Sequence, residues 1–411
     1  MSKSILIGPF TQLLPMSGLP LKGALADEQL PIIENGGIVV SEGKIQKIGV
    51  FADLKSDDID IHHIEGEQVC LPGLVDAHTH ICFGGTRARD YAMRNAGVSY
   101  LEIAKAGGGI WDTVTQTRQA SQEELVEGIL ERSQKHLQNG ITTIEVKSGY
   151  GLSVEQELKM LRAINQANDK TEVDLVATCL AAHIKPKDWS GDKTYLEEMT
   201  STLFPTIKSE NLATRVDAFV EESAFSPEEI APYFQKAKEM GFDITVHADQ
   251  FTAGGSKVAI QFGALSADHL EASTEKEIQL LAKSDVISMA LPGASMGLGC
   301  AYTPARKILD AGGALAIASD HNPGSAPMGD LLTQASVLGT FEKLSNAEVL
   351  SGITFRASAA LKLTDRGVLQ TGAHADFVTF PTHNYQEITY HQGQLKPNAV
   401  WKNGKQVFKK D

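Results

Sequence analysis

The feature that most constrains the fold is a series of eight apolar runs that alternate with helical patterns through the middle of the chain. Short apolar runs bounded by turn residues are typical of buried strands. They lie at residues 75–80, 141–148, 173–183, 216–222, 243–247, 264–269, 286–291 and 314–320. Eight strands that alternate with helices predict a parallel sheet, and their number favours a closed (β/α)8 barrel over an open sheet.

Several intervening helices begin with a recognisable cap. Each start places a Glu or Gln three residues after a Ser or Thr, a spacing in which the two residues satisfy each other's backbone N–H groups. The caps are Ser121, Ser153, Ser226 and Thr274. These helix starts between the strands support an α/β fold.

The two ends of the chain carry the pattern of antiparallel strands instead. Residues 37–40 and 45–48 flank a turn, and Asn403-Gly404 forms a strong hairpin signal between two short strands. We therefore predict a small β-sandwich domain built from residues 1–69 and 359–411, around a barrel at 70–358. Residues 15–30 have no clear assignment.

The charge balance excludes some classes of function. The 411 residues include 37 Lys and Arg against 51 Asp and Glu, a net charge of −14, which argues against binding nucleic acid or an anionic membrane. No run approaches the ~18 apolar residues of a membrane span, and the start of the chain lacks a secretory segment. The cysteines are far apart and form no metal or disulfide pattern. We expect a cytoplasmic protein that acts on a small molecule.

Polar residues at the carboxyl ends of the predicted strands point to a metal site, because these ends meet at the mouth of a barrel. His78 and His80 lie two apart on the first strand and so share a face. His247 ends the fifth strand and Asp320 the eighth. Three imidazoles and one carboxylate suit a single Zn²⁺ or similar ion with a water in the open position, so we predict these four residues as ligands.

Each of these residues alone has a plainer explanation. A lone His-x-His pattern is weak, a buried histidine is more often a hydrogen-bonded core residue, and Ser-Asp after a strand is more often a helix cap. The combination is more specific than its parts. Half of the twelve histidines fall at or just beyond predicted strand ends, namely His78, His80, His183, His247, His269 and His321.

The predicted barrel, the terminal β segments, the Asp-Ala-His-Thr-His motif at 76–80 and Asp320 resemble the amidohydrolase superfamily of metal-dependent hydrolases. Within it, the chain is similar to the imidazolonepropionase family over nearly its whole length. The motifs that carry this likeness are Phe-Gly-Gly-Thr-Arg at 83–87, Glu-Val-Lys-Ser-Gly-Tyr-Gly at 145–151, and segments 106–110, 246–249, 266–270 and 320–325.

The resemblance implies hydrolysis of 4-imidazolone-5-propanoate (imidazolonepropionate) to N-formimino-L-glutamate, a step of histidine degradation. It implies one Zn²⁺ or Fe³⁺ ion per subunit and a homodimer. Hydroxide activated by the metal would attack the ring carbonyl. His269 would hydrogen-bond the water or the developing oxyanion. Asp320 would act as general base and then as general acid towards the leaving nitrogen.

The resemblance also implies substrate contacts. Arg87 resembles a carboxylate clamp, since a guanidinium binds a carboxylate bidentately. Tyr150 and His183 resemble contacts to the ring. The loop after Asp320 matches the segment that binds the product in this family, through Asn322, Gly324 and Ser325. Plainer roles remain open: a surface salt bridge for Arg87, rim packing for Tyr150, a backbone hydrogen bond for His183, and ordinary turn chemistry for the loop.

Two positions depart from the family pattern. Gln250 stands where many relatives carry Glu, and an amide cannot shuttle protons, so we expect it to orient substrate by hydrogen bonds. His321 stands where an aromatic or small residue is common, and its role is undecided. The fourth strand offers Glu221 and Glu222 but no lysine that could bridge two metals, which favours one ion. For Lys147 we favour a structural or electrostatic role.

Two other functions are possible for a chain with this scaffold. A mononuclear nucleobase-type deaminase would carry His-x-x-Glu on the fifth strand. Gln250 argues against it, and Arg87 argues for a substrate with an acidic tail. A non-catalytic binding protein on the same scaffold would have lost ligands, whereas all four predicted ligands are present.

Overall fold

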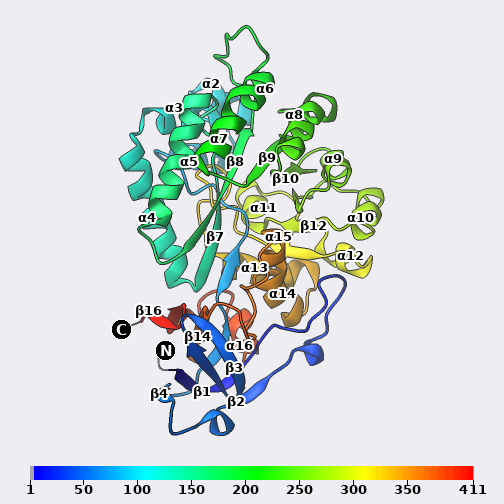
Figure 1. Ribbon diagram of the computed structural model, residues 1–411. Helices are drawn as coiled ribbons and strands as arrows, with labels where there is room; N and C mark the ends of the chain where they lie inside the picture. Colours follow the sequence, from blue (N-terminus) through cyan, green and yellow to red (C-terminus); the bar gives the residue numbers. More distant parts are fainter. Residues whose placement is uncertain (1–3, 411) are drawn as a thin grey trace.

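The computed structural model describes residues 4–410, which form a barrel and a smaller sheet beside it (Figure 1). The barrel sheet has eight strands in the order β13-β12-β11-β10-β9-β8-β7-β6, and each hydrogen-bonded pair in it is parallel. Its strands are β6 Leu74–Asp76, β7 Ile141–Lys147, β8 Asp174–Ala182, β9 Arg215–Val220, β10 Asp243–Ala248, β11 Ser266–His269, β12 Ile287–Ala290 and β13 Leu315–Ile317. The predicted (β/α)8 barrel is therefore confirmed.

The barrel closes between the segments that follow its first and last strands. β6 and β13 have only three residues each. Beyond them, the Asp320 N–H donates to the His78 carbonyl at 3.0 Å, and the His80 N–H donates to the His321 carbonyl at 2.9 Å. This closing seam thus consists of the residues that the sequence marked as metal ligands and their neighbours.

Helices cover the outside of the barrel (Figure 1). The helices of the described residues are α1 Ala88–Asn95, α2 Tyr100–Lys105, α3 Ile110–Gln119, α4 Gln122–Gln138, α5 Val154–Asn168, α6 Tyr195–Glu198, α7 Phe204–Glu210, α8 Pro227–Glu239, α9 Gly255–Phe262, α10 Glu275–Ala282, α11 Pro292–Leu298, α12 Ala305–Asp310, α13 Leu331–Glu342, α14 Asn346–Gly352, α15 Phe355–Ala360 and α16 Gln386–Tyr390. The last of them, α16, lies beside the small sheet (Figure 1). Within the described chain, no helix has both the length and the apolar character needed to cross a membrane.

The predicted caps hold these helices, although not all in the same way. Ser121 and Ser226 form full capping boxes. Ser153 and Thr274 cap α5 and α10 through their own hydroxyls, which accept from Gln156 N and Lys276 N. A side-chain cap of this kind contributes about 1 kcal/mol, so the helix starts are locally encoded.

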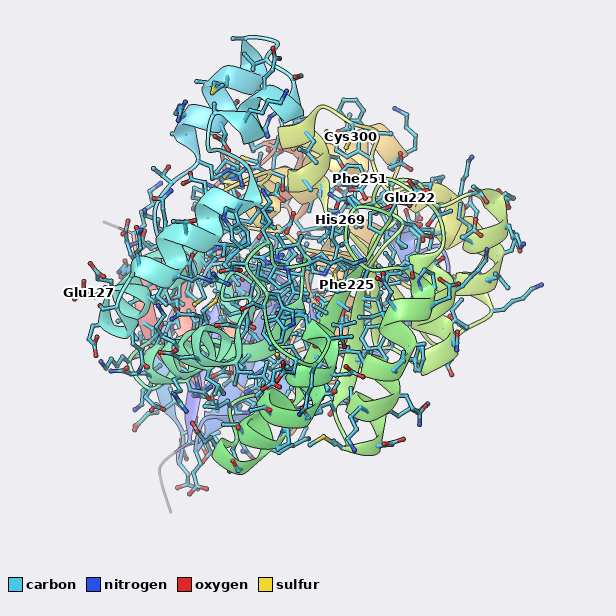
Figure 2. All side chains as sticks on the ribbon, turned by 90° about the horizontal axis from the view of Figure 1, so that it is seen from above. Glu127, Glu222, Phe225, Phe251, His269 and Cys300 are labelled. Carbon is cyan, nitrogen blue, oxygen red and sulfur yellow. The ribbon has the colours of Figure 1, made fainter. Side chains whose placement is uncertain are left out.

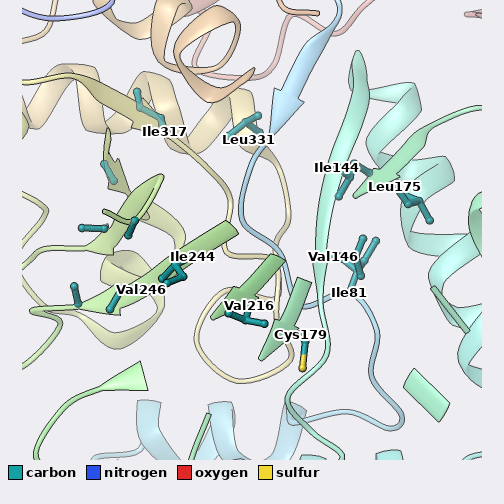
Figure 3. Packing of buried hydrophobic residues seen from close by; sticks show 14 of the residues in the cluster. Ile81, Ile144, Val146, Leu175, Cys179, Val216, Ile244, Val246, Ile317 and Leu331 are labelled. Atoms are coloured by element: carbon teal, nitrogen blue, oxygen red, sulfur yellow. The ribbon is translucent and has the colours of Figure 1, made fainter. Parts of the chain in front are cut away.

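The main core lies between the strands and the helices (Figure 3). Ile144 and Val146 of β7, Val216 of β9, and Ile244 and Val246 of β10 belong to it and are buried. Because successive side chains of a strand point to opposite faces, the residues between them face the barrel interior. The inward set is polar and buried: Glu145, Lys147, Asp217, Thr245, His247 and Asp268.

The chain ends form one further sheet, in the order β16-β15-β14-β5-β1-β2-β3, with β4 paired to β1 off this path. Its strands are β1 Ile5–Leu13, β2 Ile33–Ser41, β3 Lys44–Val50, β4 Asp60–His63, β5 Val69–Pro72, β14 Phe377–Phe380, β15 Ala399–Lys402 and β16 Lys405–Lys409. Phe10, Phe377 and Trp401 share its core. The two ends thus build one small β unit, as predicted, whereas the boundaries at residues 69/70 and 358/359 remain a prediction.

The segment without a sequence assignment runs along the barrel. The Gly23 N–H donates to the Gly313 carbonyl at 2.8 Å, just before β13, and the Leu25 N–H donates to Glu348 of α14 at 3.1 Å. Arg356, which is fully buried, donates to the Gly23 carbonyl at 2.8 Å. Because these contacts are long-range, no local sequence pattern predicts the path of residues 15–30.

Candidate metal centre and active site

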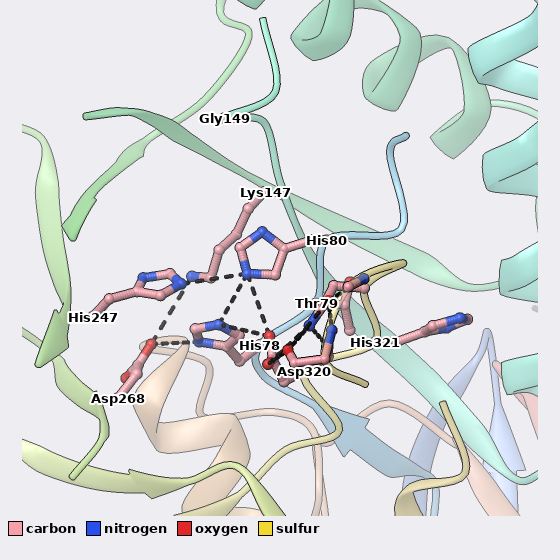
Figure 4. Close-up of polar contacts among 12 residues, drawn as sticks. His78, Thr79, His80, Lys147, Gly149, His247, Asp268, Asp320 and His321 are labelled. Carbon is pink, nitrogen blue, oxygen red and sulfur yellow. Dashed lines mark hydrogen bonds and ion pairs between the residues drawn. The ribbon is translucent and has the colours of Figure 1, made fainter. Parts of the chain in front are cut away.

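The four predicted ligands meet at the closing seam (Figure 4). His80 Nε2 lies 3.3 Å from Nε2 of His78 and 3.3 Å from Nε2 of His247. Asp320 Oδ1 lies 3.4 Å from Nε2 of His80 and 3.5 Å from Nε2 of His78. Four ligand atoms about 2.1 Å from one tetrahedral ion would be about 3.4 Å apart, and these four pairs, which do not include His247 with His78 or with Asp320, have that spacing. Within residues 4–410, the groups whose ligand atoms all lie within 4.8 Å of one another are His78, His80 and Asp320, and His78, His247 and His269.

The carboxylate contacts behind His78 and His247 leave lone pairs that converge. His78 Nδ1 pairs with Asp268 Oδ2 at 2.7 Å, and His247 Nδ1 lies 2.9 Å from Asp217 Oδ2. An imidazole that carries its proton on Nδ1 has only a lone pair on Nε2. Both Nε2 atoms face His80 Nε2, which can supply one proton at most. A bound cation satisfies all of them, and carboxylates behind metal-binding histidines hold this tautomer.

The protonation states of His80, His247 and Asp320 are those that metal binding needs. Burial lowers the pKa of His80 well below its ordinary value and that of His247 to about 3, so both rings are neutral. Burial acts to raise the pKa of Asp320, but its contacts with His78 and His80 outweigh burial and hold that pKa well below its ordinary value. Neutral imidazoles and an ionised carboxylate are ready to coordinate.

His78 shows that the centre attracts positive charge. Burial and Lys147 both act to lower the pKa of His78. The bonds to Asp268 and Asp320 more than offset them and raise the pKa of His78 to about 9. A site that stabilises an extra proton in a buried place also stabilises a cation there.

Lys147 lies behind the ligands, inside the barrel. Its Nζ is 2.7 Å from Glu145 Oε1, 2.8 Å from Asp217 Oδ2 and 4.0 Å from Asp268 Oδ2. Burial acts to lower the pKa of Lys147, but Asp217 and Glu145 raise it above its ordinary value, so the ammonium stays charged. One cation thus balances the carboxylates that orient His78 and His247. Sequence analysis missed Glu145 and Asp217, whose only signal is a charge inside an apolar strand.

His269 stands beside the four ligands. One nitrogen of its ring lies within 4.8 Å of ring nitrogens of His78 and His247, so these three histidines form a second possible ligand group. Its backbone is left-handed, with φ of 84°, and Asp320 has φ of 52°. Such a conformation costs a residue other than glycine on the order of 1–3 kcal/mol and clusters at functional sites.

Arg87 faces the loop after the seam. Its Nε donates to Asp90 Oδ2 at 2.5 Å, and Asp90 also accepts the Gly109 N–H at 2.8 Å. Arg87 Nη1 lies against Gly324, where a Cβ would be 3.0 Å away. The side chain is 11% exposed. The Asp90 contact holds the guanidinium by its Nε edge, which leaves Nη1 towards the loop and the mouth.

Tyr150 and His183 pack on the ligand His80. The ring of His183 stacks on that of His80, with centroids 5.4 Å apart, and Tyr150 lies 5.4 Å from His183 and 5.9 Å from His80. His183 Nδ1 bonds the Gly149 carbonyl at 3.0 Å. Burial lowers the pKa of His183 to about 4, so the ring is neutral. The backbone hydrogen bond and the place beside the metal site therefore coexist.

The loop after Asp320 is organised by Asn322. Its Nδ2 donates to Asp320 Oδ2 at 2.9 Å and to Ser325 Oγ at 3.0 Å. Its Oδ1 accepts from Gly324 N and Ser325 N, both at 2.8 Å. Turn chemistry is thus present, and it also holds the ligand carboxylate. Gln250 is half-buried, two residues beyond the end of β10.

His321 turns away from the metal centre. Its Nδ1 lies 2.9 Å from Nε2 of His136 on α4, and His136 Nδ1 is 3.5 Å from Asp76 Oδ2. Asp76 also accepts the Ser319 N–H at 2.9 Å. His321 therefore joins the seam to α4 and contributes its backbone, not its ring, to the site.

Comparisons with known proteins show the family of the chain. Residues 69–407 match the amidohydrolase family. The chain is 40% identical over 380 residues to the imidazolonepropionase of Bacillus mycoides (strain KBAB4), a match that covers 91% of this chain and 89% of that one. It is 39% identical over 388 residues to the imidazolonepropionase of Bacillus cytotoxicus, covering 93% and 91%.

Solved structures share the fold at low identity. A guanine deaminase of E. coli has a TM-score of 0.76 at 16% identity, covering 100% of both chains. An adenosine deaminase from Xanthomonas campestris with bound zinc has a TM-score of 0.71 at 20% identity, covering 98% of this chain and 92% of that one. This likeness extends to the barrel together with the small sheet.

Proposed function

The chain belongs to the amidohydrolase family and, within it, to the imidazolonepropionases, and we propose that His78, His80, His247 and Asp320 hold its catalytic metal ion. Identity of 40% over 91% of the chain identifies a hydrolase that opens the ring of 4-imidazolone-5-propanoate to N-formimino-L-glutamate. The observation that supports the ligand set is a series of contacts of 3.3–3.5 Å that joins His80 Nε2 to Nε2 of His247 and of His78, and joins Asp320 Oδ1 to the Nε2 atoms of His78 and His80.

One ion fits this donor set. Three imidazole nitrogens and one carboxylate suit Zn²⁺, and Fe³⁺ is the alternative. A lysine that could bridge a second ion is missing from β9, whose sequence is Arg-Val-Asp-Ala-Phe-Val. When bound, the ion lowers the pKa of a coordinated water towards ~7 and so supplies hydroxide at neutral pH.

Asp320 and His269 handle the proton of the attacking water. Asp320 Oδ2, steadied by the Asn322 amide, takes the proton and delivers it to the ring nitrogen as the carbon–nitrogen bond breaks. His269 accepts a hydrogen bond from the attacking water and so helps to orient it. Gln250 is proposed to orient the ring by hydrogen bonds. These roles account for both parts of the water that is added. Its hydroxyl group goes to the ring carbonyl carbon, and its proton goes to the leaving ring nitrogen.

The substrate's two parts match two sides of the site. The propionate needs a fixed cation, and Arg87 presents Nη1 beside Gly324. The flat ring needs an apolar wall, which Tyr150 and His183 offer next to His80. The loop between these two sides is proposed to contact the substrate through Asn322, Gly324 and Ser325.

A nucleobase-type deaminase is the second candidate. It would require a proton carrier at the position of Gln250, and an amide cannot act as one. The deaminases among the structural neighbours share the fold at 16% and 20% identity. The homodimer and the cytoplasmic location suggested by the sequence remain predictions.

The test is a metal analysis combined with assays of the purified protein on imidazolonepropionate and on a small panel of cytosine, guanine and adenosine substrates. We expect about one equivalent of metal and turnover of imidazolonepropionate alone. A protein without metal and without turnover would support a binding role, and faster turnover of a nucleobase would support the deaminase.

A further inference from the structure

Glu271 is a carboxylate beside the site for which the reaction described above has no role. Its Oε1 lies 3.5 Å from Nδ1 of His269, and both side chains are 4% exposed. The same Oε1 accepts the hydroxyl of Ser295, on α11, at 3.1 Å. Glu271 thus has a support on one side and a catalytic histidine on the other.

The backbone has an unusual conformation at His269 and Leu270, next to this contact. His269 has φ of 84° and Leu270 has φ of 71°, two consecutive left-handed residues without glycine. Backbone bonds hold the bend: Leu270 N donates to the Ala248 carbonyl at 3.0 Å, and Ala272 N donates to the Asp249 carbonyl at 2.7 Å. Strain of on the order of 1–3 kcal/mol per residue persists only where the surroundings impose it.

Two buried atoms of this pair have no hydrogen-bond partner within residues 4–410. They are Nδ1 of His269 and Oε2 of Glu271. An unpaired buried polar atom costs on the order of 1–3 kcal/mol. The 3.5 Å contact joins His269 Nδ1 to Glu271 Oε1, the oxygen that also accepts from Ser295, and it can shorten once the site is filled, as catalytic hydrogen bonds do.

We propose that Glu271 is a positioning residue that accepts the Nδ1–H of His269 and so aims the lone pair of Nε2 at the attacking water. The proposal rests on the proposed function, which places His269 at that water. A base oriented by a third group, itself held by a neighbour, is the arrangement that recurs around activated nucleophiles. Ser295 is that neighbour here.

The orientation role predicts a specific kinetic signature. Glu271 does not touch the substrate, so its removal changes the chemical step rather than binding. We expect kcat of E271L to fall by about 10- to 100-fold, with KM within about twofold and the metal content unchanged. E271Q, which keeps an oxygen acceptor, is expected to lie between E271L and the original protein. E271Q also tests the proposal if E271L fails to fold.

E222Q is the matched control, because Glu222 is an exposed glutamate that follows β9 at the same end of the barrel (Figure 2). Its kinetics should stay within about twofold of the original protein. A fall in E222Q equal to that in E271Q would show a general charge effect and overturn the proposal. So would a kcat of E271L within twofold of the original, or a rise in KM alone.

A second readout does not depend on turnover. Nitrogen-15 NMR of the histidine rings reports which nitrogen carries the proton, with H269Q used to assign the signal. We expect the Nδ1–H tautomer in the original protein and a shift towards Nε2–H in E271L. If the protein does not turn over imidazolonepropionate, the proposed function fails while the NMR result still decides the role of Glu271. An unchanged tautomer in E271L would overturn it.

Discussion

At the scale of single residues, the two oxygens of a proposed ligand carboxylate can have different neighbours. Asp320 is the clearest case: Oδ1 faces His78 and His80, while Oδ2 accepts the amide of Asn322. A carboxylate can serve both sides because it only accepts hydrogen bonds. In the proposed mechanism each oxygen therefore has a separate task, coordination for Oδ1 and proton transfer for Oδ2.

The first prediction concerns D320N. The amide keeps the shape but removes the negative charge and turns one acceptor into a donor, which meets the donating amide of Asn322. We expect turnover to fall by more than about 100-fold, together with a loss of bound metal measured by elemental analysis. A kcat close to that of the original protein would refute the role of Asp320 as ligand and proton carrier.

The second prediction concerns R87M, which keeps most of the apolar stem but removes the charge. Loss of a charge-assisted contact to the propionate should raise KM by about 10- to 100-fold while metal content stays normal. The matched control is R89M, since Arg89 is an exposed arginine on the same helix. Unchanged kinetics of R87M would place Arg87 outside the binding site.

At the scale of elements, what could be predicted is what local chemistry encodes. Ser121 and Ser226 start helices in their own first turn, and the Asn403-Gly404 turn has positive φ at both residues, as a two-residue hairpin requires. The path of residues 15–30 depends on partners such as Glu348, far along the chain, and no pattern within the segment encodes it.

The same division holds for the site. His78 and His247 were predictable because strand ends meet in a barrel, so position alone brings them together. Asp217 is the partner of His247, and Lys147 pairs with Asp217. Both lie in strands where neighbouring residues are apolar, and only the assembled barrel shows that they face one another. The direction of His321 was likewise decided by His136 on another element.

The third prediction concerns the contact between the barrel and the small sheet. Asp174, at the start of β8, lies 2.7 Å from Lys402 of β15 and 2.7 Å from Arg366. Burial acts to raise its pKa, but Lys402 and Arg366 outweigh burial and hold the pKa below its ordinary value of 3.8. Stability from a lowered carboxyl pKa is present above the unfolded pKa and lost as pH falls through the folded one.

We therefore expect D174N to melt at a lower temperature than the original protein at pH 7, with the gap narrowing as pH falls below 3.8. Thermal melts across pH measure this, with D169N, at an exposed aspartate, as the control. A constant gap down to pH 3 or below would mean that the ionic contact does not tie the two units together.

At the scale of the whole molecule, the proposed ligands join distant parts of one chain. They come from the segments after β6 and β13 and from β10, so an ion would bind three separate strands of the barrel. A ligand that binds only the folded chain stabilises it by mass action.

The fourth prediction follows from this. Removal of the metal by a chelator should abolish turnover and lower the melting temperature, because the converging lone pairs and buried charges lose their cation. Zn²⁺ or iron should restore both, and the ion that does so at the lower concentration identifies the preferred metal. A melting temperature unaffected by the chelator, in a protein shown to be metal-free, would place the ion outside the barrel strands.

The closing seam has a consequence for how the enzyme is made. The Asp320–His78 and His80–His321 backbone bonds join the last strand region to the first, and the same residues hold the proposed ion. While the chain is still leaving the ribosome, two histidines are already exposed but their carboxylate partner has not been synthesised. The full set of proposed ligands therefore comes together only when the ring of strands closes.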